Sequence, residues 1–325
     1  MIKTFLSTGD ELKTIDNLAE RGVWISLTSP SPAEIEMVCA KTGVSLDLVR
    51  AALDEEERPR IEVEEDQLLI LINIPTSEGT NGRLYFDTIP LGIIVAENYV
   101  ITVCLKDNPI MAEFEHGRPR SFYTFMRTRF VLQILFKTAT YYLRYLKQID
   151  KRTNEIENQL HRSMRNEELI KLLNLEKSLV YFTTSLKANG IVMEKLLRSH
   201  LAKTPDPDSQ KASQILKMYA DDEDLLEDVI TENKQAIDMS ETHSSILSGM
   251  MDAFASVISN NLNIVMKFLT SVTIVLSLPT MVASFYGMNV HLPFQHSPFA
   301  FSIIIGICFL FSLTGVILLR RKDMF

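Results

Sequence analysis

The stretch "NIVMKFLTSVTIVLSLPTMVASFYGMN", residues 263–289, decides how this chain folds. It carries a single charged residue, Lys267, close to its start. A second run, "FAFSIIIGICFLFSLTGVILL" at 299–319, carries no charge. About 20 apolar residues in a helix cross the hydrocarbon core of a bilayer, and a lysine near the end of a span reaches the headgroups. The sequence therefore predicts two membrane-spanning helices.

The charge of the chain is distributed unevenly. The 325 residues have a net charge of −8, and nearly all charged residues come before residue 253. The N-terminus lacks the apolar run of a signal peptide. These features predict a cytoplasmic acidic body followed by a membrane segment, and the negative charge argues against nucleic acid as the main partner.

Positive charges predict the orientation of the spans. Arg320, Arg321 and Lys322 follow the second span directly, whereas the segment 290–298 between the spans has no Lys or Arg. Cytoplasmic loops carry the excess of Lys and Arg. We therefore expect a multi-pass protein of the cell membrane with both termini in the cytoplasm and the short loop outside.

The body before the spans has mixed α and β patterns. Runs at 22–29, 61–75 and 87–104 are rich in Val, Ile and Leu and predict strands, with helices covering them. Ser31, Pro32 and Glu34 form a strong helix start. Apolar residues at three- and four-residue steps predict long helical hairpins from about 120 to 200. We expect an α+β fold built as an α/β/α sandwich with long helices.

A long helix is expected to connect the body to the membrane. Pro205 and Pro207 break the helical region, and no further proline occurs before Pro279. One helix from about 211 to 286 would be too long for a single small domain to bury, so it would be shared between subunits or form a stalk. The expected organisation is an α/β domain at 1–120, hairpins at 121–210, a stalk at 211–261, spans at 262–289 and 299–319, a loop at 290–298 and a basic tail at 320–325.

The first span has a polar face. Small and polar residues recur at three- or four-residue steps, with one seven-residue gap that Met266 fills: Asn263, Thr270, Thr273, Ser277, Thr280, Ser284 and Gly287. The mean step of about 3.5 residues is that of a coiled coil, so this face can point toward a common axis of several copies. The same register reaches Asp252 before the span. We expect a water-lined symmetric pore, although Ser and Thr also serve ordinary helix packing.

Tyr286, Gly287, Met288 and Asn289 end this span, and with the stretch 263–289 and the basic tail they resemble the CorA family of magnesium transport proteins. The resemblance is strong after residue 250 and looser before 200. It implies a homopentamer with a funnel-shaped cytoplasmic domain, and first membrane helices that line the pore. It also implies that Asn263, Thr280 and the constriction residue Leu269 lie along this pore.

The motif has a chemical rationale as an ion filter. Mg²⁺ gives up its water reluctantly. Neutral oxygens of Asn289 and Gly287 can accept hydrogen bonds from the hydrated ion and still release it, with Met288 packing and Tyr286 bracing the motif. The structural alternative is a helix C-cap built from Gly and Asn.

The resemblance also implies regulation by the transported ion. Asp228 corresponds to a stalk aspartate that shares a divalent ion with an acidic residue of the neighbouring subunit. Its N-terminal partner is left open among Asp54 to Glu57, Glu62, Glu64, Glu65, Asp66 and Asp87. Cytosolic Mg²⁺ bound there would hold the funnel closed, and Asp252 is a further candidate ring in the funnel.

The expected function is Mg²⁺ influx through a channel that also admits Co²⁺ or Ni²⁺. Two other functions compete with it. One is zinc transport, as in the ZntB branch, but that branch usually has Ile at the position of Met288. In the loop, His291 and His296 would suit Co²⁺, Ni²⁺ or Zn²⁺ better than Mg²⁺, or they are ordinary exposed loop residues. A non-conducting membrane sensor or scaffold would not need a polar face that ends in a filter motif. An enzyme is not expected, because no P-loop, HExxH motif or nucleophile–base arrangement is present.

Overall fold

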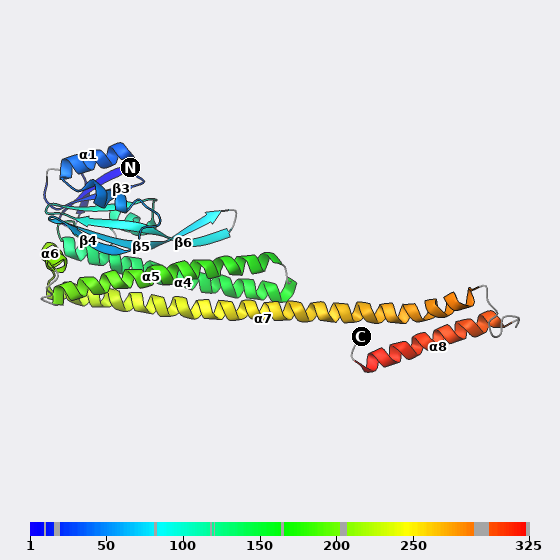
Figure 1. Ribbon diagram of the computed structural model, residues 1–325. Helices are drawn as coiled ribbons and strands as arrows, with labels where there is room; N and C mark the ends of the chain where they lie inside the picture. Colours follow the sequence, from blue (N-terminus) through cyan, green and yellow to red (C-terminus); the bar gives the residue numbers. More distant parts are fainter. Residues whose placement is uncertain are drawn as a thin grey trace. The chain divides into compact units, whose positions relative to one another are not determined.

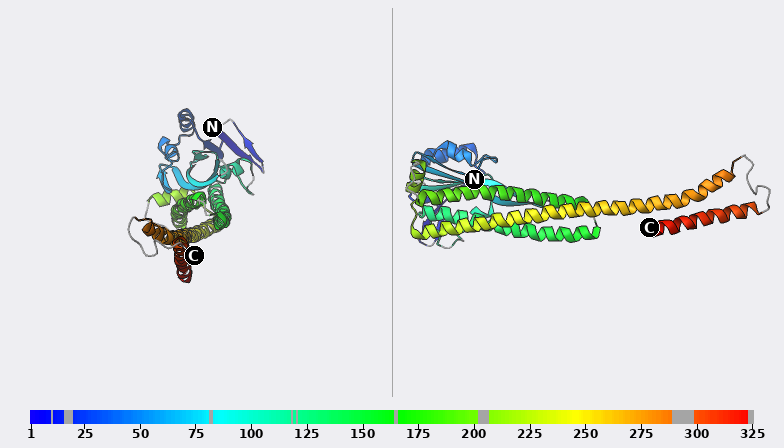
Figure 2. Two further views of the ribbon diagram at one scale, coloured as in Figure 1. Left: turned by 90° about the vertical axis from the view of Figure 1, so that its right-hand side faces the viewer. Right: turned by 60° about the horizontal axis from the view of Figure 1, so that its bottom comes forward.

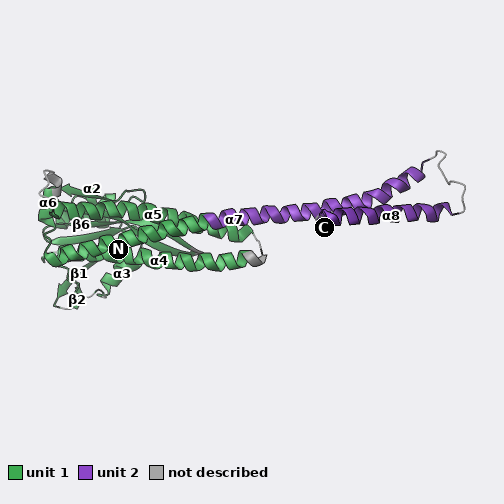
Figure 3. Cartoon of the chain, turned by 90° about the horizontal axis from the view of Figure 1, so that it is seen from below, with its two compact units in different colours: residues 1–248 green, residues 249–325 purple. Residues whose placement is uncertain are grey.

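The computed structural model describes residues 1–9, 11–15, 20–80, 83–117, 119, 121–163, 166–201, 207–288 and 299–322. The chain divides into two compact units, residues 1–248 and 249–325, which Figure 3 shows in different colours. The first unit holds the sheet and most of the helices. The second unit holds the end of the longest helix and the last helix.

The described strands of the first unit form one mixed sheet. They are β1 (Ile2–Thr8), β2 (Glu11–Thr14), β3 (Val23–Thr28), β4 (Arg60–Glu64), β5 (Gln67–Thr80), β6 (Arg83–Val95) and β7 (Tyr99–Cys104). Their order is β2-β1-β3-β7-β6-β5-β4, and β3 and β7 pair in parallel whereas the other neighbours are antiparallel. The strands predicted at 22–29, 61–75 and 87–104 are all present.

Helices cover both faces of the sheet, which confirms the predicted α/β/α sandwich (Figures 1 and 2). Helices α1 (Pro32–Thr42) and α2 (Leu46–Ala51) cover one face, while α4 (Arg127–Ser163) and α5 (Asn166–Leu201) cover the other, and α3 (Pro109–Glu115) contacts α4. The expected start of α1 is also confirmed, because Ser31 and Glu34 form a reciprocal capping box.

On the face of the sheet that α1 and α2 cover, helix and sheet approach each other closely. Leu69 and Leu71 of β5 belong to a buried cluster with residues of α1 and α2. A Cβ atom at Gly92 of β6 would lie 2.4 Å from the Cβ of Ala52. Glycine is therefore required at this position so that the end of α2 can approach the sheet.

The opposite face contains a buried polar cluster. Asn189 of α5 accepts a hydrogen bond from the backbone N–H of Asn73 at 2.9 Å and donates to the Asn73 carbonyl at 2.7 Å. The Tyr142 hydroxyl of α4 donates to the same carbonyl at 2.9 Å, and the Asn73 amide donates to Ser185 at 3.2 Å. Burial raises the pKa of Tyr142 above its ordinary value. These bonds tie β5 to both long helices.

The longest helix begins later than the sequence predicted. A short helix, α6 (Pro207–Ile215), precedes α7 (Ala220–Tyr286), so the expected start at residue 211 is wrong. The carbonyl of Lys217 accepts a hydrogen bond from Thr128 at 2.9 Å, and the Asp222 carboxylate accepts the Tyr219 N–H at 3.2 Å. Both contacts use backbone groups that a continuous helix would need, and Asp222 then caps the first turn of α7.

The second unit leaves most of its apolar side chains on the outside. Both α7 and α8 (Ala300–Arg321) are long and apolar enough to cross a membrane. No residue of α8 is buried, and Phe301 and Phe309 are 75% and 69% exposed. A helix that is apolar all round is suited to lipid.

Candidate functional site

Helix α7 turns one side toward α8 within the second unit. The Cys308 thiol of α8 donates to the Pro279 carbonyl at 3.8 Å. A Cβ atom at Gly315 would lie 3.3 Å from Leu278 and 3.9 Å from Val275. The side of α7 that contains Val275, Leu278 and Pro279 is therefore the side on which α8 packs.

The predicted polar face lies on the opposite side of α7. The partly buried positions on the α8 side are 275, 279, 282 and 286. Two residues before each of them lies an exposed residue of the polar face: Thr273, Ser277, Thr280 and Ser284. Two residues correspond to about 200° of rotation in an α-helix. All predicted pore-lining residues are exposed in the single chain: Asn263, Met266, Leu269, Thr270, Thr273, Ser277, Thr280 and Ser284. This set is called the polar stripe below.

Hydroxyl groups in the polar stripe have their protons engaged. Thr273 and Thr280 donate to the carbonyls of Leu269 and Leu276 at 2.8 and 2.9 Å, and Ser277 donates to Ile274 at 2.9 Å. A hydroxyl that donates its proton retains lone pairs that accept hydrogen bonds. The stripe therefore offers acceptors, which suit the outward-pointing protons of water around a cation.

The motif at the end of α7 is described in part. Tyr286 is the last helical residue and is half-buried, and Gly287 and Met288 are exposed. Asn289 and the loop histidines His291 and His296 lie outside the described residues. The predicted filter therefore remains a prediction.

Gly287 has no left-handed backbone, unlike the glycine of a usual helix C-cap. Its N–H donates to the Ala283 carbonyl at 3.0 Å, and an added Cβ would meet nothing closer than 3.5 Å. The single chain thus has room for a side chain here. A requirement for glycine would have to come from a bound ion or from other copies of the chain.

The predicted regulatory carboxylates are exposed on α7. Asp228 lies in the first unit and Asp252 in the second, and both side chains are exposed. Within the described ranges, no group of three or more His, Cys, Asp or Glu side chains is arranged to hold a metal. Of the candidate partners, Glu57 and Glu62 both form salt bridges with Arg60, the latter at 3.0 Å.

Sequence reasoning did not find the α8 side of α7. Ser271 is fully buried and lies on that side. In the sequence it is a small polar residue like those of the polar stripe, so its type does not distinguish it from them. Its neighbours Thr270 and Thr273 are both exposed. Only the packing of α8 separates Ser271 from them.

Fold and site together define a class: a membrane protein with a soluble α/β/α domain whose last helix continues into the first of two candidate spans. The chain belongs to the family of CorA-like Mg²⁺ transporter proteins, because the model of this family matches residues 19–321. The chain is also 30% identical over 312 residues to the cobalt/magnesium transport protein CorA of Methanocaldococcus jannaschii, covering 93% of this chain and 91% of that protein.

Solved structures agree with this assignment. The complete structure of the CorA magnesium transporter from Methanocaldococcus jannaschii matches with a TM-score of 0.81 and 26% identity, covering 100% of this chain and 99% of that chain. The cytoplasmic domain of ZntB from Vibrio parahaemolyticus matches with a TM-score of 0.56 and 15% identity, covering 80% of this chain and 97% of that chain. The ZntB match shows a shared fold alone.

Proposed function

We propose that the chain forms a homopentameric channel for Mg²⁺ influx, with Co²⁺ and Ni²⁺ as secondary ions. The observation that carries the proposal is the position of the polar stripe, exposed and opposite the side on which α8 packs. In a symmetric assembly this arrangement lets α7 line a pore while α8 lies outside it. The printed name of the CorA relative, a cobalt/magnesium transport protein, supports these ions.

In this proposal the ion passes in hydrated form. The stripe presents hydroxyl acceptors, and the carbonyl of Gly287 and the side chain of Asn289 form rings at the outer end. Neutral acceptors bind the water shell of Mg²⁺ without stripping it, which avoids the high cost of dehydration. Leu269 and Met266 are exposed apolar positions on the same face, and they form a hydrophobic constriction between the polar positions.

Regulation by cytosolic Mg²⁺ is part of the proposal. Asp228 is exposed and surrounded in sequence by other acidic residues of α7, so its copies in neighbouring subunits would repel each other without a cation. Bound Mg²⁺ neutralises this repulsion and stabilises the closed state. When Mg²⁺ is lost, the repulsion returns and the channel opens. A ring of Asp252 in the funnel attracts cations toward the pore.

The two candidate spans and the basic residues at the C-terminal end of α8 support a placement in the membrane. The proposal places the protein in the cell membrane with both termini in the cytoplasm and the loop between the spans outside. Transport needs no enzymatic step, because the membrane potential supplies ~2.3 kcal/mol per charge per 100 mV.

Flux into proteoliposomes with an internal Mg²⁺-sensitive dye tests the pore. Thr273→Val, in the stripe, is compared with Thr314→Val in α8, where the threonine makes the same type of hydrogen bond to its own helix. One lost hydrogen bond is worth ~1 kcal/mol, which corresponds to about fivefold, and because the loss recurs in every copy we expect a reduction of at least about fivefold for Thr273→Val. We expect no change for Thr314→Val, and equal effects would contradict the pore.

The filter and the sensor are tested in the same vesicles. Asn289→Ala should abolish selective Mg²⁺ uptake, and Asp228→Asn should remove inhibition by Mg²⁺ on the side of the soluble domain. Entry of Zn²⁺ without Mg²⁺ would favour a zinc transporter. Absence of any flux would favour the non-conducting sensor or scaffold.

A further inference from the structure

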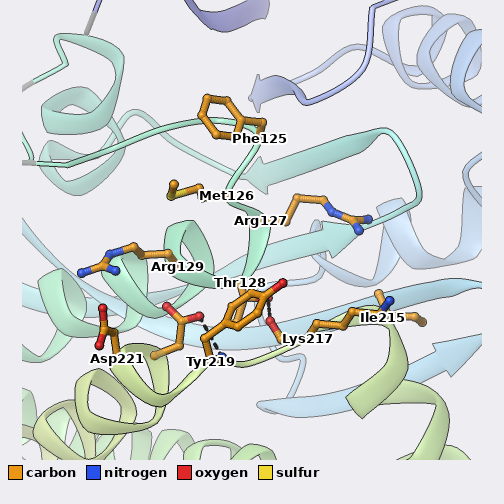
Figure 4. Close-up of a pocket in the computed structure, with 10 residues that line it drawn as sticks. Phe125, Met126, Arg127, Thr128, Arg129, Ile215, Lys217, Tyr219 and Asp221 are labelled. Carbon is orange, nitrogen blue, oxygen red and sulfur yellow. Dashed lines mark hydrogen bonds between the residues drawn. The ribbon is translucent and has the colours of Figure 1, made fainter. Parts of the chain in front are cut away.

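A pocket of about 500 Å³ opens in the first unit where α4 and α7 begin. It is formed by the segment before α4, the first residues of α4, the connection between α6 and α7, and the first turn of α7 (Figure 4). None of its residues belongs to the polar stripe or to the predicted regulatory carboxylates. Its size is within the range of small-molecule sites.

Two basic side chains of the pocket have unused donors. The Nε of Arg129 is buried and has no hydrogen-bond partner, and neither Arg129 nor Lys217 forms a salt bridge with another described residue. A third, Arg127, donates to the Ala96 carbonyl. Because this Nε atom is buried, a ligand would reach Arg129 through the terminal nitrogens of its guanidinium, whose charge has no carboxylate partner among the described residues. Guanidinium and ammonium groups together favour a phosphate.

The pocket also presents aromatic rings to solvent. Phe125 and Tyr219 are 52% and 74% exposed. Figure 4 shows Phe125 at the upper end and Tyr219 at the lower end of the lining residues, with Met126 between them and nearer to Phe125. Exposed rings at the edge of a basic pocket provide faces on which a nucleic-acid base can stack.

Acidic residues complete the pocket. Asp222 is buried, and its carboxylate accepts a hydrogen bond from the Tyr219 N–H at the start of α7. This carboxylate is therefore already engaged within the chain. Asp221 is exposed, and Figure 4 shows it on the same side of the Tyr219 ring as Arg129. A free carboxylate would repel a bare phosphate. Mg²⁺, however, is usually bound by one or two carboxylates together with phosphate oxygens.

We propose that this pocket binds the Mg²⁺ complex of a nucleoside di- or triphosphate. Arg129 and Lys217 bind phosphate oxygens, Asp221 binds the Mg²⁺ directly or through its water, and Phe125 and Tyr219 hold the base. The ligand thereby contacts the first turn of α7, the helix that also carries the polar stripe. The proposal concerns binding and does not depend on the proposed transport.

Isothermal titration calorimetry on the full-length protein in detergent tests this site. The probes are ATP with Mg²⁺, ATP with EDTA, MgCl₂ alone and inorganic pyrophosphate with Mg²⁺. We expect affinity for Mg²⁺-ATP to fall about tenfold in Arg129→Gln and in Lys217→Gln, the loss expected for one charge-assisted hydrogen bond. Arg152→Gln is the matched control, because it removes a charge from an exposed position of the same helix α4. It should bind as the wild type does.

Further comparisons separate the parts of the ligand. Tyr219→Leu should weaken Mg²⁺-ATP and leave Mg²⁺-pyrophosphate unchanged, and EDTA should weaken ATP binding to wild type but have less effect in Asp221→Asn. Lys217 is exposed, so Lys217→Gln keeps the test valid if Arg129→Gln does not fold. The proposal is overturned if Mg²⁺-ATP gives no saturable binding up to millimolar concentration, or if the pocket variants bind it like Arg152→Gln. Equal affinities for Mg²⁺-ATP and Mg²⁺-pyrophosphate would also overturn it.

Discussion

In the first unit, Ile, Leu, Val and Phe side chains fill the space between the sheet and its helices, whereas in the second unit the same residue types lie on the outside of α7 and α8. Burial from water accounts for the packing of the first unit. It cannot account for the second unit in a single chain. In the proposed assembly, lipid and other copies of the chain would cover the exposed apolar surface of that unit.

Polar groups differ between the units as well. In the first unit, Asn73, Tyr142 and Asn189 satisfy one another across three elements. In the second unit, Thr273 and Thr280 bond to carbonyls of their own helix. These polar residues of the first unit thus connect different elements, whereas Thr273 and Thr280 bond within one helix.

Removing a large apolar side chain is the strongest way to test this contrast. Phe182 is fully buried and contacts the rings of Phe86 and Tyr142, whereas Phe309 of α8 is 69% exposed. Phe182→Ala should lower the free energy of unfolding of the first unit by ~3–5 kcal/mol. Phe309→Ala should leave it unchanged. Urea unfolding in detergent, followed by fluorescence of Trp24, measures both, and a similar loss in the two variants would break the contrast.

The second prediction concerns the polar groups. Asn189→Ala leaves the backbone N–H of Asn73 without its partner in a buried place, and we expect a loss of ~2–3 kcal/mol in the same assay. Thr273→Val removes a hydroxyl that bonds only within its own helix, and its effect on unfolding should stay within about 0.5 kcal/mol. A large loss for Thr273→Val would show that the stripe stabilises the fold, which would weaken its assignment to a pore.

A pair of glycines in α8 sharpens the description of the second unit. A Cβ at Gly306 would meet nothing within 4 Å, whereas one at Gly315 would lie 3.3 Å from Leu278. Gly306→Ala should stabilise the helix by ~1 kcal/mol through its higher propensity. Gly315→Ala should lose this gain, because Leu278 has to move. Thermal unfolding in detergent compares them, and an equal gain would contradict the packing of α8 on α7.

The smallest expected effect is at alkaline pH in the first unit. Burial and a hydrogen bond to Glu113 at 2.8 Å raise the pKa of Tyr141 to about 12. Because the folded pKa lies above the unfolded value, the neutral hydroxyl stabilises the fold below about pH 10, and this contribution declines as pH rises toward 12. The loss at pH 10.5 is under ~1 kcal/mol. Unfolding of Tyr141→Phe should depend less on pH between 8 and 10.5, and an identical pH dependence would refute this.

The local features of the fold could be predicted because they depend on neighbouring residues. The capping box at Ser31 and Glu34 and the strand at β3 need only short-range patterns. The start of α7 could not be predicted, because it depends on Thr128, which lies far away in the sequence and bonds to Lys217. Gly92 likewise gives no local signal of its contact with Ala52.

For the candidate site, the sequence alone determined that α7 and α8 are long and apolar enough to span a membrane and that polar residues follow one face of α7. Length, hydropathy and periodicity are properties of one segment, so they can be read without a partner. Only the tertiary structure decided that α8 packs opposite this face and that Ser271 belongs to the other side. It also decided that Arg129, Lys217 and Tyr219 share one pocket. These relations join segments distant along the chain, and periodicity within one helix carries no information about what packs on each side of it.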